Sequence, residues 1–116
     1  MSERNSVDAG RHQDVRHLQR IRSWPESDHL GLMEYVESLW LSGEWGWKQH
    51  RNPFTGQVVS RIYQLSTGGS AGNEDMISAL EANRGFWERC LVSYRPGGLY
   101  EFKITMTAGE KPDQKS

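Results

Sequence analysis

The stretch L-S-T-G-G-S-A-G-N-E-D, residues 65–75, marks a change from strand to helix near the centre of the chain. A run rich in β-branched and aromatic residues precedes it, and its adjacent glycines allow the backbone to turn sharply. Asn73 is a favourable N-cap, and Glu74 and Asp75 then occupy the first helical turn, where the helix dipole favours negative charge. The stretch therefore predicts a strand, a tight turn and a helix in succession.

The glycines of this stretch raise the question of phosphate binding. A Walker loop has a lysine directly after its last glycine, whereas Asn73 follows Gly72 here. The spacing G-G-x-x-G also differs from the dinucleotide fingerprint G-x-G-x-x-G. Glu74 and Asp75 would repel an anion at the helix N-terminus. We therefore interpret the stretch chiefly as a structural joint.

A binding role for the same stretch is the alternative. Small polar side chains and free backbone amides can bind a peptide or a small polar ligand. Because of the two carboxylates, we expect such a ligand to be neutral or cationic rather than a phosphate. The candidate binding residues are Ser66, Thr67, Gly68, Gly69, Ser70 and Asn73.

Two β-hairpins are predicted, one on each side of this joint. Residues 44–50 and 57–65 are strand-like, and R-N-P-F-T-G between them supplies loop residues. Residues 85–94 are predicted as a strand that turns at residues 95–98 into a strictly alternating strand at residues 100–106. The inward-facing residues of this second hairpin are expected to be Phe86, Cys90, Val92, Tyr94, Tyr100, Phe102, Ile104 and Met106.

Two helices complete the prediction. Apolar residues recur at helical spacing through residue 41, with Ser23 as N-cap, Pro25 in the first turn and Gly43 after the end. A shorter helix follows Asn73 and ends near Asn83. The order α-β-β-α-β-β predicts an α+β two-layer sandwich, with two helices on one face of a four-stranded antiparallel sheet.

The chain of 116 residues fits one domain, which we expect at residues 23–107. Residues 1–22 are predicted to be a mostly disordered or weakly helical arm, and residues 108–116 a disordered tail. The arm is locally basic at residues 11–22. It is either a solvated arm or a segment that docks on a partner or on nucleic acid.

Composition excludes several classes of protein. The formal charge of −1 gives no overall field for nucleic acid or an acidic membrane, and no apolar run could span a membrane. One cysteine excludes internal disulfides and cysteine-rich zinc sites, and the four histidines lack metal-binding spacing. The N-terminus has no signal-peptide pattern. We expect a cytoplasmic protein with no metal or other cofactor.

Trp45 and Trp47 are a second candidate site, because residues two apart share a face of a strand. With Lys48, His50 and Arg51 they would form an aromatic and basic platform for stacked bases. The alternative is that both rings belong to the core, which the scarcity of aliphatic residues favours. An exposed tryptophan would instead favour a binding surface.

Catalysis is not indicated by any group of residues, since no activated nucleophile or carboxylate pair is visible. A Cys–His pair would require a histidine beside Cys90, and His50 is the partner that the predicted sheet offers. Cys90 is instead interpreted as a buried small hydrophobic residue. No catalytic residue is predicted.

Three functions remain as hypotheses. The first is an interaction or regulatory module that binds another protein through a sheet face or the glycine-rich loop. The second is a nucleic-acid-binding module that uses Trp45, Trp47, Arg51 and the basic arm. The third is a small enzyme with a site at residues 66–73. An uncovered edge strand would also favour a homodimer through sheet pairing.

The pattern L-S-T-G-G-x-x-G-N-E-D, then F-W, then R-P-G-G-x-Y-x-F resembles a group of short uncharacterised proteins of bacteriophages and of bacteria, especially actinobacteria. The resemblance covers about residues 40–104 and implies a phage or mobile-element setting, with no activity or cofactor. Members of the group often carry tryptophan where this chain has Ser70 and histidine where it has Leu99. A site that depended on those two positions would therefore be altered here.

Overall fold

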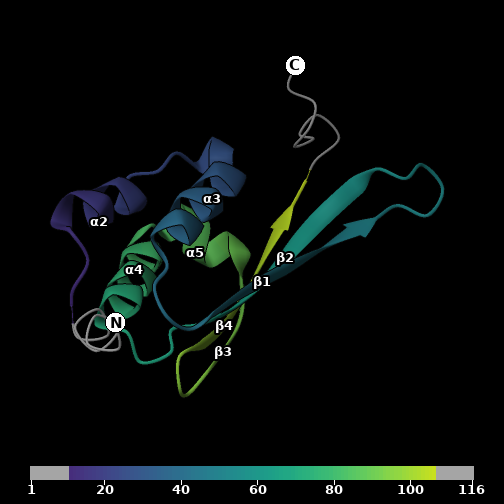
Figure 1. The fold of residues 1–116 in the computed structure, drawn as a ribbon. Helices are drawn as coiled ribbons and strands as arrows, with labels where there is room; N and C mark the ends of the chain where they lie inside the picture. The colour runs from purple at the N-terminus through teal and green to yellow at the C-terminus, as the bar shows by residue number, and fades with distance from the viewer. Residues whose placement is uncertain (1–10, 107–116) are drawn as a thin grey trace.

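The computed structural model describes residues 11–106, in which helices cover one face of a four-stranded antiparallel sheet (Figure 1). The strand order is β1-β2-β4-β3, so two hairpins lie side by side with β2 and β4 at the centre. The strands are β1 (Glu44–Arg51), β2 (Val58–Ser66), β3 (Leu91–Arg95) and β4 (Leu99–Thr105). The α+β class and the four-stranded antiparallel sheet are therefore confirmed.

The described residues contain four α-helices and one short 3-10 helix, where the sequence predicted two helices. They are α2 (Val15–Arg22), η1 (Glu26–Asp28), α3 (His29–Leu39), α4 (Ala71–Ala82) and α5 (Arg84–Cys90). None of these helices has the length and apolar character that a membrane span requires.

The register of the sheet separates an inner from an outer face. Tyr63 lies opposite Trp47 on one side and Phe102 on the other, and these side chains share the face toward the helices. On the outer face, Ile62 lies between Lys48 and Lys103, and both lysines are exposed. The alternating strand at residues 100–106 places Phe102, Ile104 and Met106 in buried positions, as predicted.

The N-terminal helix belongs to the domain, which corrects the boundary predicted at residue 23. Ile21 of α2 is fully buried in the core. The side-chain amide of Asn83, at the end of α4, donates to the carbonyl oxygens of Ile21 and Trp24 at 3.0 and 3.1 Å. This bond pair fixes the end of α2 against α4. Residues 1–10 and the predicted tail at 108–116 lie outside the described residues.

The start of the first predicted helix is also corrected. Ser23 hydrogen-bonds back to the carbonyl oxygen of Gln19 and caps the end of α2. The chain continues in an extended conformation at Pro25 and forms one 3-10 turn before α3 begins. Asp28 is the N-cap of α3, because its carboxylate accepts from the backbone N–H of Gly31 at 3.0 Å.

Residues 84–90 form helix α5, so the strand predicted across residues 85–94 begins only at Leu91. Asn83 caps this helix by accepting from the backbone N–H of Phe86. Phe86 and Cys90 are four residues apart, a spacing that places them on one face in a helix as well as in a strand. Both are buried, whereas Val92 and Tyr94, predicted to face inward with them, are exposed.

The loop end of the β1–β2 hairpin extends past the helical layer (Figure 1). Its loop closes through two backbone hydrogen bonds, from Asn52 to Gln57 and from Gly56 to Asn52, each 2.8 Å. The Asn52 side chain also accepts from the backbone of Phe54 and Thr55. The projecting loop is thus held by its own hydrogen bonds, as the predicted turn residues allow.

Candidate functional site

Asn73 connects three segments of chain at the glycine-rich joint. Its side-chain amide donates to the carbonyl oxygens of Ser42 at 2.6 Å and Thr67 at 3.2 Å. Its side-chain oxygen accepts from the backbone N–H of Leu41 at 2.9 Å. Asn73 is fully buried, so these bonds tie the start of α4 to the loop before β1. All of its side-chain groups are used within the fold.

The N-cap of α4 is Ser70 and not Asn73, which corrects the predicted cap. The Ser70 hydroxyl accepts from the backbone N–H of Asn73 at 3.2 Å, so the helix begins at Ala71. Asn73 stands three residues into the structure that it was expected to cap. The Asn73 side chain instead bonds to the loop before β1, and Ser70 caps the helix.

Thr67 is also engaged within the fold. The Thr67 hydroxyl donates to the Glu74 carboxylate at 2.6 Å, and the Thr67 backbone N–H donates to the carbonyl oxygen of Gly98 at 3.0 Å. Thr67 therefore links α4 to the turn of the second hairpin. Ser66 is half-buried and pairs with Leu99 in the sheet.

Close approach explains one of the two adjacent glycines. Gly68 has φ +61°, and a Cβ there would lie 2.7 Å from the Gly43 Cα. Gly68 and Gly69 are both exposed and both have positive φ. The candidate binding residues Ser66, Thr67, Gly68, Gly69, Ser70 and Asn73 all lie in this joint. Because three of its polar side chains bond internally, ligand binding there stays a prediction that the fold does not require.

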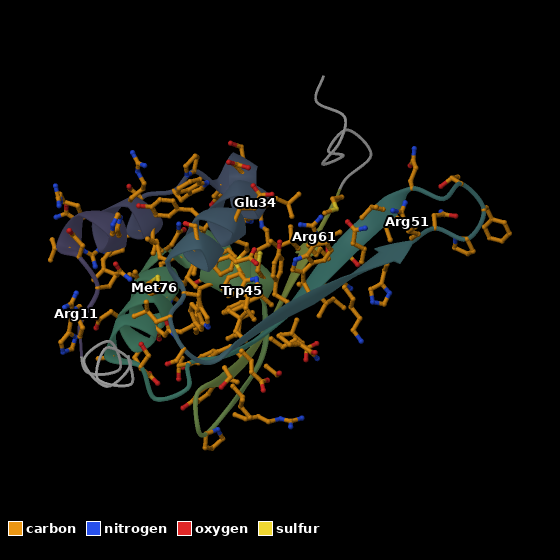
Figure 2. All side chains as sticks on the ribbon, viewed as in Figure 1. Arg11, Glu34, Trp45, Arg51, Arg61 and Met76 are labelled. Carbon is orange, nitrogen blue, oxygen red and sulfur yellow. The ribbon has the colours of Figure 1, made fainter. Side chains whose placement is uncertain are left out.

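Trp45 and Trp47 separate into two environments. Trp45 is half-buried and packs edge-on against Trp40 and Tyr63, with ring centroids 5.2 and 5.9 Å apart. Trp47, two residues further along β1, is 46% exposed. In Figure 2, Trp45 lies beneath the helices, whereas Arg51 lies out on the projecting hairpin. The expectation of a core role therefore suits Trp45 better than Trp47.

Arg61 completes a group on the inner face that the sequence reasoning missed. Its guanidinium carbon lies 3.9 Å from the centroid of the Trp47 ring. The same guanidinium donates to Gln49 at 2.9 Å and to the Tyr63 hydroxyl at 3.3 Å. Burial raises the pKa of Tyr63, and the bond from Arg61 opposes that rise. The available signal was the predicted hairpin itself, since its observed register places Arg61 diagonally across from Trp47.

The loop of the hairpin exposes a second aromatic ring. Phe54 is 93% exposed at the tip. Arg51, predicted as part of the aromatic platform, donates from its guanidinium to the carbonyl oxygen of Gly56 at 2.8 Å. That bond spans the loop and leaves the charge at the surface. Trp47 and Arg51 thus lie on one hairpin, but Arg61 and not Arg51 contacts the Trp47 ring.

The hairpin is basic although the chain as a whole is nearly neutral. Residues 45–73 contain no aspartate or glutamate, and they include Lys48, Arg51 and Arg61. Lys48 faces outward, and Arg61 lies on the inner face beside Trp47. The projecting end of the sheet therefore carries positive charge on both faces.

Cys90 contacts His29 and not His50, the partner considered from the sequence. The Cys90 sulfur lies 3.5 Å from Nδ1 of His29, and both residues are buried. Burial raises the pKa of the Cys90 thiol to about 12. The thiol is thus fully protonated near neutral pH, which opposes a role as nucleophile. Among the described residues, no three His, Cys, Asp or Glu side chains are grouped to hold a metal ion.

Comparison with known proteins gives no match to a family model, a curated protein or a solved structure. The resemblance to short phage and actinobacterial proteins stays a prediction. The geometry of the described residues is therefore the basis for a functional proposal.

Proposed function

We propose that the protein is a small cytoplasmic protein-interaction module that docks its partner through the projecting end of the β1–β2 hairpin. The observation that carries this proposal is the exposure of Trp47 and Phe54 on a hairpin end that the helices leave uncovered. Tryptophan and arginine are the residues that most often dominate binding energy at protein interfaces. Trp47 and Arg61 provide that pair here, with the indole ring held by the guanidinium.

Preorganisation supports the same proposal. Arg51, Asn52 and the backbone bonds of the loop hold the tip in one conformation before any partner arrives. Arg61 is held by Gln49 and Tyr63. A surface that is ordered in the free protein loses less conformational entropy on binding.

Affinity capture from the native host tests this proposal. Phe54→Ser removes a ring that is 93% exposed and should leave the fold intact. Truncation of a central aromatic contact typically costs about 2 kcal/mol or more, or roughly 30-fold in affinity. The matched control is Val15→Ser, which removes a 60% exposed side chain from α2. Capture that Phe54→Ser and Trp47→Ala leave unchanged, or that Val15→Ser abolishes, would contradict the proposal.

Nucleic-acid binding through the same hairpin is the second candidate. It is favoured by the absence of carboxylates from residues 45–73 and by the stacked Trp47–Arg61 pair. A two-stranded ribbon also fits the major groove of DNA. Fluorescence anisotropy with single- and double-stranded oligonucleotides at about 50 and 200 mM salt would reveal it as affinity that falls with salt. Absence of such binding removes this candidate.

A further inference from the structure

We propose that the open edge of β1 binds an extended acidic segment of the partner protein, which adds to the sheet as a fifth strand. This inference rests on the proposed function, because it specifies how the hairpin holds its partner. Within residues 11–106, β1 is an edge strand that pairs with β2 alone. Its other side presents backbone groups that another strand can pair with.

The two edges of the sheet differ in how well they accept a strand. β3 at the opposite edge has five residues, and its register shifts between Leu91 and Ser93. Such an irregularity disrupts the regular ladder that an added strand needs. β1 has eight residues and keeps regular register from Glu44 to His50, with its irregularity only at the loop end. The longer, more regular edge is therefore the one that can be extended.

Charge selects the chemistry of the added strand. After Glu44, every ionisable side chain on β1 is basic, namely Lys48, His50 and Arg51. A second copy of β1, paired parallel in register or antiparallel about Lys48, would place the two Lys48 side chains beside each other, and like charges on facing strands are destabilising. A strand with carboxylates opposite Lys48 and His50 would instead gain cross-strand attraction. Charge complementarity therefore favours an acidic partner over self-association.

The backbone of the edge favours a polypeptide over a nucleic acid. An open strand edge alternates N–H donors with C=O acceptors. Phosphate oxygens only accept hydrogen bonds, so a phosphate backbone would offer no donor to the carbonyl oxygens of β1. Another extended peptide supplies donors and acceptors at the same spacing.

The two faces of β1 predict the residue pattern of the added strand. On the inner face, Trp45 and Trp47 border the edge, and Trp47 remains 46% exposed although Arg61 lies over its ring. On the outer face lie Lys48 and His50. Because side chains alternate along a strand, the segment should alternate apolar residues beside the tryptophans with acidic residues beside the cations.

A synthetic peptide of eight residues, alternating glutamate and valine with blocked ends, tests this inference on the full chain. The readout is amide hydrogen exchange by NMR, together with a titration followed by tryptophan fluorescence. We expect the peptide to slow exchange of backbone amides within Glu44–His50 and to leave β3 unchanged. Lys48→Glu should weaken binding about tenfold. Its matched control is Lys103→Glu, which reverses an exposed lysine in the same row of the outer face, away from the edge.

Several outcomes would overturn strand addition. They are equal binding of a glutamine–valine peptide, equal effects of the two lysine reversals, or no protection of β1 by the acidic peptide at about 1 mM. If the β1 amides become protected when the protein concentration rises without peptide, the edge binds a second copy of this chain. If only an oligonucleotide protects them, the edge binds nucleic acid. Partner capture that depends on Phe54 without protection of β1 would end this inference and leave the proposed function standing.

Discussion

Replacing Asn73 with alanine should lower the free energy of unfolding by about 2–4 kcal/mol. The side chain makes three hydrogen bonds, to Ser42, Thr67 and Leu41, at 2.6, 3.2 and 2.9 Å. Each contributes about 1 kcal/mol, and a buried partner left unsatisfied costs about 1–3 kcal/mol. The bond to Thr67 is fully buried, whereas water can reach the Leu41 and Ser42 groups after truncation. The expected loss is therefore smaller than the total obtained by adding the full penalty for all three partners.

Urea unfolding followed by tryptophan fluorescence measures this loss. The matched control is Asn52→Ala, since Asn52 also bonds two backbone N–H groups, but in the exposed hairpin loop. Its cost should stay below about 1 kcal/mol. Asn73→Asp keeps the acceptor for Leu41 and removes both donations, so it should destabilise at least as much as alanine. If the free energy of unfolding of Asn73→Ala is within about 1 kcal/mol of the wild-type value, the interpretation of this stretch as a structural joint is wrong.

Three further predictions concern the rest of the chain. Because burial raises the pKa of Cys90 to about 12, a disulfide reagent at about pH 8 should modify it slowly in the native protein and rapidly in urea; fast native modification would contradict the buried thiol. Hydrogen bonds from Arg16 lower the pKa of Asp14 from 3.8 to about 2, so its stabilising effect is complete above pH 3.8 and lost as pH falls toward 2. Asp14→Asn should flatten that part of an acid-unfolding profile, and an unchanged profile would count against the pair. Gly98→Ala should destabilise the fold more than Gly97→Ala. Both glycines have positive φ, but only at Gly98 would the new methyl group clash with a neighbouring side chain, that of Thr67. Equal urea midpoints for the two variants would contradict this clash.

The sheet was predictable because its signals are local. The turn residues around Asn52 and Pro96 and the alternation from Tyr100 to Met106 each specify a hairpin without knowledge of the rest of the chain. The two hairpins then join into one sheet through β2 and β4, a choice of strands that the sequence did not specify. The inner face of β4 was accessible from sequence, whereas Val92 and Tyr94 of β3, which were expected to face inward, are exposed.

Helices α2 and α5 were harder to predict, because long-range contacts determine them. Residues 15–22 have one thin apolar stripe, and Ile21 becomes a core residue only because α4 and Asn83 lie against it. At α5, the spacing of Phe86 and Cys90 suits helix and strand equally, and the Asn83 cap decides between them. The cap of α4 was misplaced for a similar reason, because Asn73 is engaged by a loop more than thirty residues away.

The candidate site was only partly predictable. Sequence identified Trp45, Trp47 and Arg51, but it did not distinguish the half-buried ring from the exposed one. That difference arises because the helices cover one end of β1 and leave the other uncovered, an arrangement that no local pattern encodes (Figure 1). Arg61 was overlooked because it lies on the neighbouring strand and contacts Trp47 only across the sheet.

Photo-crosslinking from two positions tests the docking surface most directly. A photoreactive phenylalanine in place of Phe54 samples the hairpin tip, and the same residue in place of Val15 samples another exposed position, on α2. In the native host, the proposal predicts one protein crosslinked from position 54, with a yield that falls in the Trp47→Ala background. Crosslinking of the partner from position 15 instead, or equally from both positions, would contradict it.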